Sequence, residues 1–240
     1  MKKLFIAVCG VLISINLSAG SFLRQVKPIE ESDEVAEEIK SAPLFRKTFA
    51  IIGDSYVQNH RRPIEETWHY RLAQKYQMKY FNYGRNGNAL VIDRKGGNWG
   101  APMLKRYGEM HTPADYVVVI AGHNDACNMD VESAGDIALF RDGVKKFAEA
   151  LKRKYPTSKI VFVSPWAVNE KGFDIVLAAY REILPSLGVS FYDAAASSGI
   201  NPEDEAMRSK IFQSKTDKAH LNKYGHSMML EKLEPFFLSL

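Results

Sequence analysis

Four short clusters of small and polar residues carry most of the chemistry that this sequence could perform. They lie at residues 53–56 (GDSY), 82–87 (NYGRNG), 122–125 (GHND) and 217–220 (DKAH). Each cluster is too short to be specific by itself. Together they supply a hydroxyl, an imidazole, a carboxylate and amide donors, which are the groups that covalent catalysis by an activated serine needs.

Ser55 is the candidate nucleophile, and it needs a base because a serine hydroxyl is weakly nucleophilic alone. His220 is the candidate base, and Asp217 precedes it by three residues. On a helical turn this spacing places both side chains on one side, so we expect the carboxylate to reach and orient the imidazole. We therefore predict a catalytic triad of Ser55, His220 and Asp217. The structural alternatives are a helix N-cap at Ser55 and a surface ion pair at the other two residues.

The negatively charged oxygen of a tetrahedral intermediate needs hydrogen-bond donors fixed around it. We predict that the backbone N–H groups of Ser55 and Gly87 and the side-chain amide of Asn124 supply three such donors. Glycine suits a position where the backbone approaches a substrate closely, and Gly84 meets this requirement as well. The residue types alone leave the choice between the two glycines open.

Aromatic residues near these clusters are candidates for contacting a substrate. We predict that Tyr56, His123 and Trp99 line the site, since the first two belong to clusters and Trp99 lies in a Gly- and Asn-rich loop at residues 84–102. That loop is long enough to form a wall or a lid. The sequence contains no GxSxG, GxxxxGK[ST], HExxH or CxxC motif, and we predict neither a metal site nor a cofactor.

Alternating apolar runs and amphipathic segments are expected to position these clusters. Strands are predicted at residues 48–52, 79–83, 116–120, 160–163 and 189–192. Their nearly continuous apolar character is typical of strands that are covered on both faces. Apolar residues recur at helical spacing over 64–76 and 137–151, and a last helix is predicted from about residue 223. The pattern predicts an α/β fold with an open parallel sheet, whose ligands bind at the carboxyl ends of the strands.

The four clusters and their order resemble the SGNH, or GDSL-type, hydrolase family over residues 48 to about 232. The matching positions for the family's Ser, Gly, Asn, Asp and His are Ser55, Gly87, Asn124, Asp217 and His220. The resemblance implies a three-layer αβα sandwich around a flavodoxin-like five-stranded parallel sheet. It also implies hydrolysis of a carboxylic ester through an acyl-serine intermediate.

Two details of the resemblance bear on the site. Gly87 is favoured over Gly84 because its spacing from Asn82 is closer to the family pattern. Tyr56 stands where the commonest family form has leucine, a departure that concerns substrate fit rather than the chemistry.

The substrate is predicted to be a short-acyl ester, with acetyl favoured, on a small molecule or a polysaccharide. Three alternatives remain from the sequence. The chain could be a lipase, lysophospholipase or thioesterase acting on longer acyl chains. It could also be a sugar O-acyltransferase, or a non-catalytic carbohydrate-binding module on the same fold.

Composition and the amino-terminal sequence indicate the class of protein and its localisation. The 240 residues are 46% hydrophobic and 25% charged, as in a soluble globular domain, and the formal net charge of +4 does not predict a nucleic-acid partner. Residues 1–20 read as a cleaved signal peptide, with two lysines, an apolar stretch and small residues in turn. We therefore expect a periplasmic or secreted protein with no stable membrane anchor after cleavage.

The mature chain is expected to comprise an acidic leader at residues 21–45 and a hydrolase domain at 46–240. The leader is predicted to be a solvated linker or an exposed helix. Cys127 is the only cysteine outside the predicted signal peptide, so no internal disulfide is expected. The oligomeric state is left open.

Overall fold

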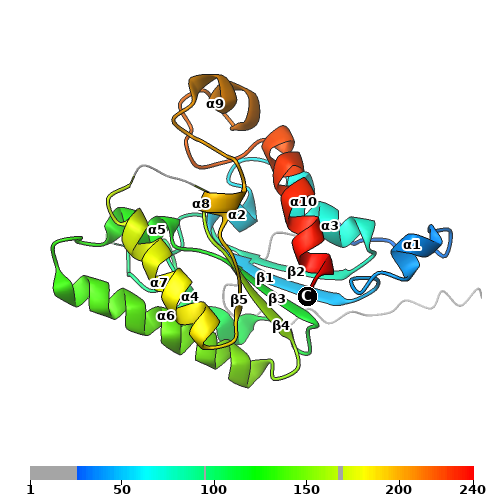
Figure 1. Ribbon diagram of the computed structural model, residues 1–240, viewed down its shortest axis with the longest axis horizontal. Helices are drawn as coiled ribbons and strands as arrows, with labels where there is room; N and C mark the ends of the chain where they lie inside the picture. The colour runs from blue at the N-terminus through cyan, green and yellow to red at the C-terminus, as the bar shows by residue number, and fades with distance from the viewer. Residues whose placement is uncertain (1–25, 95, 167–169) are drawn as a thin grey trace, which may run out of the picture.

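Five parallel strands form a single sheet in the order β2-β1-β3-β4-β5 (Figure 1). The computed structural model describes residues 26–94, 96–166 and 170–240, so the predicted signal peptide lies outside the described residues. The strands are β1 (Thr48–Gly53), β2 (Lys79–Gly84), β3 (Tyr116–Ile120), β4 (Lys159–Val163) and β5 (Ser190–Tyr192). The predicted five-stranded parallel sheet is confirmed, with strand ends that differ by one residue at most.

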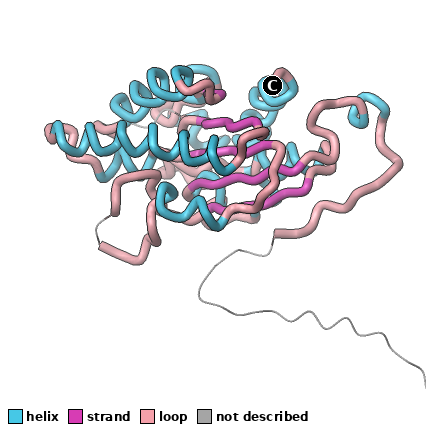
Figure 2. Tube along the Cα trace, turned by 90° about the horizontal axis from the view of Figure 1, so that it is seen from below, coloured by secondary structure: helices cyan, strands magenta, loops and turns pink. Residues whose placement is uncertain are grey.

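Helices cover both faces of this sheet, which gives the predicted three-layer arrangement (Figures 1 and 2). The longer helices are α3 (Trp68–Lys75), α6 (Ala134–Lys154), α7 (Phe173–Ser186) and α10 (Lys223–Leu238). The shorter ones are α1 (Glu37–Lys40), α2 (Ser55–Gln58), η1 (Ile64–Glu66), α4 (Met103–Arg106), η2 (Tyr107–Glu109), α5 (His123–Asn128), α8 (Ala194–Ser197) and α9 (Glu205–Ile211). Within the described ranges, no helix has the length and apolar character needed to cross a membrane.

Strand β3 shows why the sheet is buried on both faces. Val117 and Val119 face the core beneath α6 and α7, whereas Val118 and Ile120 face the core beneath α3 and α10. Successive side chains of a strand point to opposite faces, so a strand between two helical layers needs apolar residues at every position. Each fully buried aliphatic side chain contributes roughly 1.5–3 kcal/mol relative to an exposed one.

The first predicted helix is interrupted. Residues 64–76 were expected to form one helix, but Ile64–Glu66 form a 3₁₀ turn and α3 starts only at Trp68. Thr67 between them is extended, and its hydroxyl oxygen accepts a hydrogen bond from the backbone N–H of Tyr70. A threonine cap of this kind begins a new helix, which the apolar spacing alone does not reveal.

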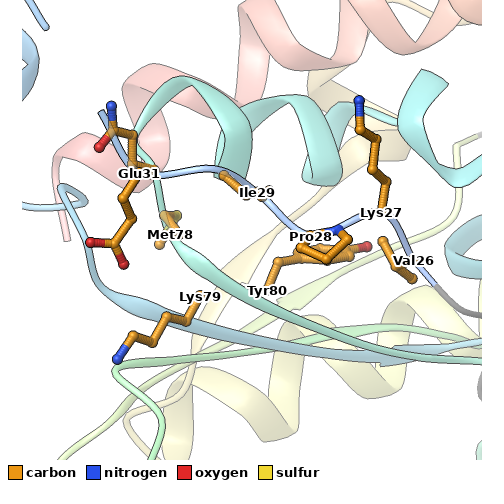
Figure 3. A pocket seen from close by; sticks show the side chains of 9 residues that line it. Val26, Lys27, Pro28, Ile29, Glu31, Met78, Lys79 and Tyr80 are labelled. Carbon is orange, nitrogen blue, oxygen red and sulfur yellow. The ribbon is translucent and has the colours of Figure 1, made fainter. Parts of the chain in front are cut away.

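The acidic leader is more closely attached to the domain than a solvated linker would be. Residues 26–31 run beside the start of β2 and line a cavity of about 200 Å³ with residues 77–80 (Figure 3). Ser32 and Gln77 exchange two hydrogen bonds between the Ser32 backbone and the Gln77 side chain, at 3.0 and 3.2 Å. The helical part is limited to α1, which buries none of its residues.

Candidate active site

The turn after β1 places Ser55 at the carboxyl edge of the sheet. Asp54 caps α2 by accepting a 2.9 Å hydrogen bond from the Tyr56 N–H, and Ser55 is the first helical residue. The turn requires glycine at position 53, because a Cβ there would lie 2.3 Å from the Val57 side chain. A helix cap and a positioned hydroxyl are therefore compatible in this turn.

The structure brings Ser55, His220 and Asp217 into one hydrogen-bonded chain. His220 Nε2 lies 2.9 Å from Ser55 Oγ, and His220 Nδ1 lies 2.9 Å from Asp217 Oδ2. The predicted helical turn at Asp217 is wrong, since this segment precedes α10 as a loop closed by an antiparallel bridge between Phe212 and Leu221. The carboxylate reaches the ring because Asp217 Oδ1 also accepts the backbone N–H of His220 at 2.8 Å, which folds the loop back on itself.

The charge on Asp217 fixes the direction of the hydrogen bonds in this chain. Burial alone would raise the pKa of Asp217, but hydrogen bonds from the ring and backbone of His220 hold that pKa below its ordinary value. An ionised carboxylate can only accept, so it receives the hydrogen on His220 Nδ1. In a neutral imidazole with its hydrogen on Nδ1, Nε2 is an acceptor, and it faces the Ser55 hydroxyl. This arrangement can remove a proton from the serine.

Two backbone N–H groups near Ser55 remain available to a substrate. Within the described ranges, neither Ser55 N–H nor Gly87 N–H donates a hydrogen bond to the protein. The N–H of Gly84, in contrast, donates to Asn82 Oδ1 at 2.8 Å. A Cβ on Gly84 would lie 2.5 Å from the backbone nitrogen of Gln58, so this glycine allows β2 to pack against α2. These contacts favour Gly87 over Gly84 as a donor.

Gly87 needs to be glycine for two further reasons. Its φ of +73° is a conformation that side-chain-bearing residues rarely adopt. A Cβ at this position would also lie 2.4 Å from the Trp99 ring. Trp99 therefore covers the turn that carries the Gly87 N–H, in agreement with a wall formed by the predicted loop.

The Asn124 amide lies beside the nucleophile turn, with its hydrogens already engaged. Asn124 Nδ2 donates to Asp54 Oδ2 at 3.0 Å and to the Asn88 carbonyl at 3.2 Å, and its Oδ1 accepts from Arg94 Nη1 at 3.0 Å. Complete burial of Asp54 raises the pKa of this carboxyl to about 7. To act on a substrate oxygen, the amide must share or exchange one of these bonds.

A sequence profile of the GDSL-like lipase/acylhydrolase family matches residues 51–228. The chain belongs to this family. The resemblance predicted from the four clusters is thereby confirmed, and the matched region contains all the residues described above.

Solved structures share the fold of this GDSL family member at low sequence identity. A protein from Lactobacillus plantarum superposes with a TM-score of 0.70 and 22% identity, covering 81% of this chain and 98% of that one. A carbohydrate acetylesterase family member from Sinorhizobium meliloti gives 0.60 and 19%, covering 81% and 100%. A family two carbohydrate esterase from Clostridium thermocellum, in complex with cellohexaose, gives 0.62 and 15%, covering 81% and 64%. A search of curated protein sequences finds no significant match.

The predicted substrate-lining residues differ in how much surface they offer. Tyr56 is only 2% exposed, and its ring packs 4.2 Å from the Trp166 ring, so it leaves little surface for a substrate. His123 lies between the Tyr56 hydroxyl and Cys127, and burial together with nearby positive charge lowers its pKa to about 4. Trp99 and His123 are partly exposed.

No group of three or more His, Cys, Asp or Glu in the described ranges could hold a metal ion.

Two site residues of this GDSL family member were missed by the sequence analysis. The ring of His60 stacks on that of His220, with centroids 4.2 Å apart and planes at 12°. Arg106 is 4% exposed and donates to the carbonyl of Gly53, the last residue of β1, and to that of Tyr83, the residue before the last in β2. No local motif marks either residue, since both act on segments that are distant in sequence.

Asp125 organises the loop that follows β2. Its carboxylate accepts the backbone N–H groups of Leu90, Val91 and Ile92 at 2.8–2.9 Å. Burial raises the pKa of Asp125, and these three donors oppose that shift. The residue thus anchors the loop that carries Gly87 to the helix that carries Asn124.

Two buried histidines make polar contacts inside the domain. His226 on α10 contacts Asn59 Oδ1 at 3.2 Å, and Asn59 ends α2 with a left-handed φ of 61°. His69 contacts the Tyr80 hydroxyl at 2.7 Å. Burial lowers the pKa of His226 to about 3 and the pKa of His69 well below its usual range. Both rings are therefore neutral at pH 7.

The depressed pKa of His226 predicts a loss of stability in acid. The unfolded chain binds a proton at this histidine below a pH of about 6.5, whereas the folded protein resists it. The free energy of unfolding should then fall by about 1.4 kcal/mol for each pH unit below 6.5. Between pH 7.5 and 5.0, the wild type should lose about 2 kcal/mol more than His226→Gln, which cannot titrate. Urea unfolding at both pH values measures this difference, and equal losses in the two proteins would contradict it.

Proposed function

We propose that this chain is an exported serine esterase, with Ser55 as nucleophile, His220 as general base and Asp217 as the group that orients the base. One observation carries the proposal, the 2.9 Å contact between His220 Nε2 and Ser55 Oγ, with Asp217 bonded to the other side of the ring. Membership of the GDSL-like lipase/acylhydrolase family supports the same reaction class.

The proposed reaction has two matching halves. His220 Nε2 takes the hydroxyl proton of Ser55 as Oγ attacks the ester carbonyl carbon, and Asp217 stabilises the resulting imidazolium. The carbonyl oxygen becomes negatively charged between the N–H groups of Ser55 and Gly87 and the Asn124 amide. His220 then protonates the departing alcohol, which leaves Ser55 acylated. Water, deprotonated by His220, attacks this ester. His220 then returns the proton to Ser55 Oγ as the acid leaves, which regenerates the free serine.

The proposed substrate is a short-acyl ester, with acetyl favoured, on a carbohydrate outside the cytoplasm. The surroundings of Ser55 support it, because His60, His123 and Trp99 supply ring surfaces with polar edges. Two similar folds belong to carbohydrate esterases, which is consistent with such a substrate. Export is proposed from the predicted signal peptide at residues 1–20.

Acyl-chain preference tests the proposed substrate class. A site that accommodates long chains gains about 0.8 kcal/mol for each methylene that it buries, or about fourfold in kcat/KM. We expect no such gain here. Nitrophenyl acetate should be the best of the acetate, butyrate, octanoate and laurate esters, and acetylated oligosaccharides should release acetate. Octanoate preferred over acetate, without acetate release from any acetylated sugar, would support a lipase or thioesterase instead.

A further inference from the structure

Arg94 donates hydrogen bonds to two uncharged oxygens of the candidate active site and not to a carboxylate. Its Nη1 donates to Asn124 Oδ1 at 3.0 Å and to the Gly87 carbonyl at 3.3 Å. Its guanidinium carbon lies 3.9 Å from the centre of the Trp99 ring. Arg94 forms no salt bridge within the described ranges, and its Nε is buried without a partner. Nothing in the mechanism above explains why a half-buried arginine stands at this position.

Arg94 is the partner that holds the oxygen side of the Asn124 amide. A guanidinium can only donate hydrogen bonds, so the amide oxygen must face it and the amide nitrogen must face away. The nitrogen then lies against Asp54 and Asn88, the neighbours in sequence of Ser55 and Gly87. An amide has nearly the same shape when rotated by 180°. Asp54 and Asn88 accept from the nitrogen and favour the same orientation. Loss of Arg94 would remove the partner of the oxygen and leave the orientation to these two acceptors alone.

We propose that Arg94 is a positioning residue, which holds the Asn124 amide with its nitrogen toward the reacting ester oxygen. The stack on Trp99 restrains the guanidinium in this place, because the planar cation is attracted to the face of the indole ring. A cation on the amide oxygen also draws electrons from the nitrogen and strengthens its N–H groups as donors. This inference rests on the proposed function, because it assigns Asn124 to the stabilisation of the oxyanion.

Replacement of Arg94 should lower kcat more than it changes KM. Loss of one oxyanion donor costs about 10²–10³ in rate, and a misoriented amide should cost part of that. We expect Arg94→Met to lower kcat for nitrophenyl acetate by about 10- to 100-fold with KM within about twofold. Arg94→Lys, which keeps the charge and the ability to donate to Asn124 Oδ1, should recover most of the loss. Arg85→Met is the matched control, because Arg85 lies on the same loop but pairs with Glu109.

A double-mutant cycle with Asn124→Ala decides whether Arg94 acts through the amide. If it does, Arg94→Met should change kcat by less than about twofold in the Asn124→Ala protein. An undiminished effect in that background would overturn the inference, as would wild-type kcat in Arg94→Met. Circular dichroism and thermal melting of each variant show whether it is folded. An inactive wild-type protein would overturn the proposed function itself, and with it the role assigned to Arg94, whereas an active wild type with additive effects would overturn the inference alone.

Discussion

Ester hydrolysis by Ser55→Ala is expected to be at least about 10⁴-fold slower than by the wild type. The variant lacks the oxygen that forms the acyl intermediate, while the donors around it remain. Because α2 is capped by Asp54 and not by Ser55, the variant should keep its fold. kcat/KM for nitrophenyl acetate measures the effect, with circular dichroism as the check on folding.

Ser186→Ala provides the matched control for this substitution. Ser186 ends α7 shortly before β5 starts, at the edge of the sheet opposite to the candidate site, and its hydroxyl bonds within its own helix. Its replacement should leave kcat/KM unchanged. More than a tenth of wild-type activity in Ser55→Ala would remove Ser55 from the mechanism.

Asp217→Asn is expected to lower kcat by about 10⁴-fold. A neutral amide does not stabilise the imidazolium, and its N–H can bond to His220 Nδ1, which would turn Nε2 into a donor facing Ser55. The amide oxygen can still accept the backbone N–H groups of Ala219 and His220, so the loop should be preserved. Steady-state kinetics and thermal melting of the variant separate these two effects.

Glu203→Gln is the control for the loss of a carboxylate near this loop. Glu203 pairs with Lys218, which lies between Asp217 and His220 in sequence. Removing this exposed ion pair should change kcat less than about twofold, since exposed pairs contribute little. If Asp217→Asn were as active as Glu203→Gln, the orienting role of Asp217 would be wrong.

The sequence predicted the sheet well because burial on both faces leaves a local signal. The run at residues 116–120 is apolar throughout, and β3 is buried throughout. The positions of Ser55, Gly87 and Asn124 could also be predicted, because these residues come shortly after the ends of β1, β2 and β3. In a parallel sheet the carboxyl ends of neighbouring strands meet at one edge, so residues distant in sequence converge without any further information.

What could not be predicted depends on contacts between distant segments. Tyr56 follows the nucleophile, yet packing on Trp166 buries it, and nothing at residues 53–56 indicates that neighbour. His60 stacks on His220 across 160 positions of sequence. The spacing of three residues between Asp217 and His220 predicts a helical turn, which is wrong. The same spacing suits a loop in which Asp217 Oδ1 accepts the backbone N–H groups of Ala219 and His220.

Labelling by a fluorophosphonate tests the central claim most directly, because this reagent modifies serine hydroxyls that a neighbouring base activates. Mass spectrometry of the intact protein and its peptides should find one adduct per chain, on Ser55. The adduct should be absent from Ser55→Ala and should form far more slowly in His220→Ala, in which Oγ has lost its base. An adduct on any other residue, unchanged labelling of Ser55→Ala, or equal labelling rates with and without His220 would contradict the account.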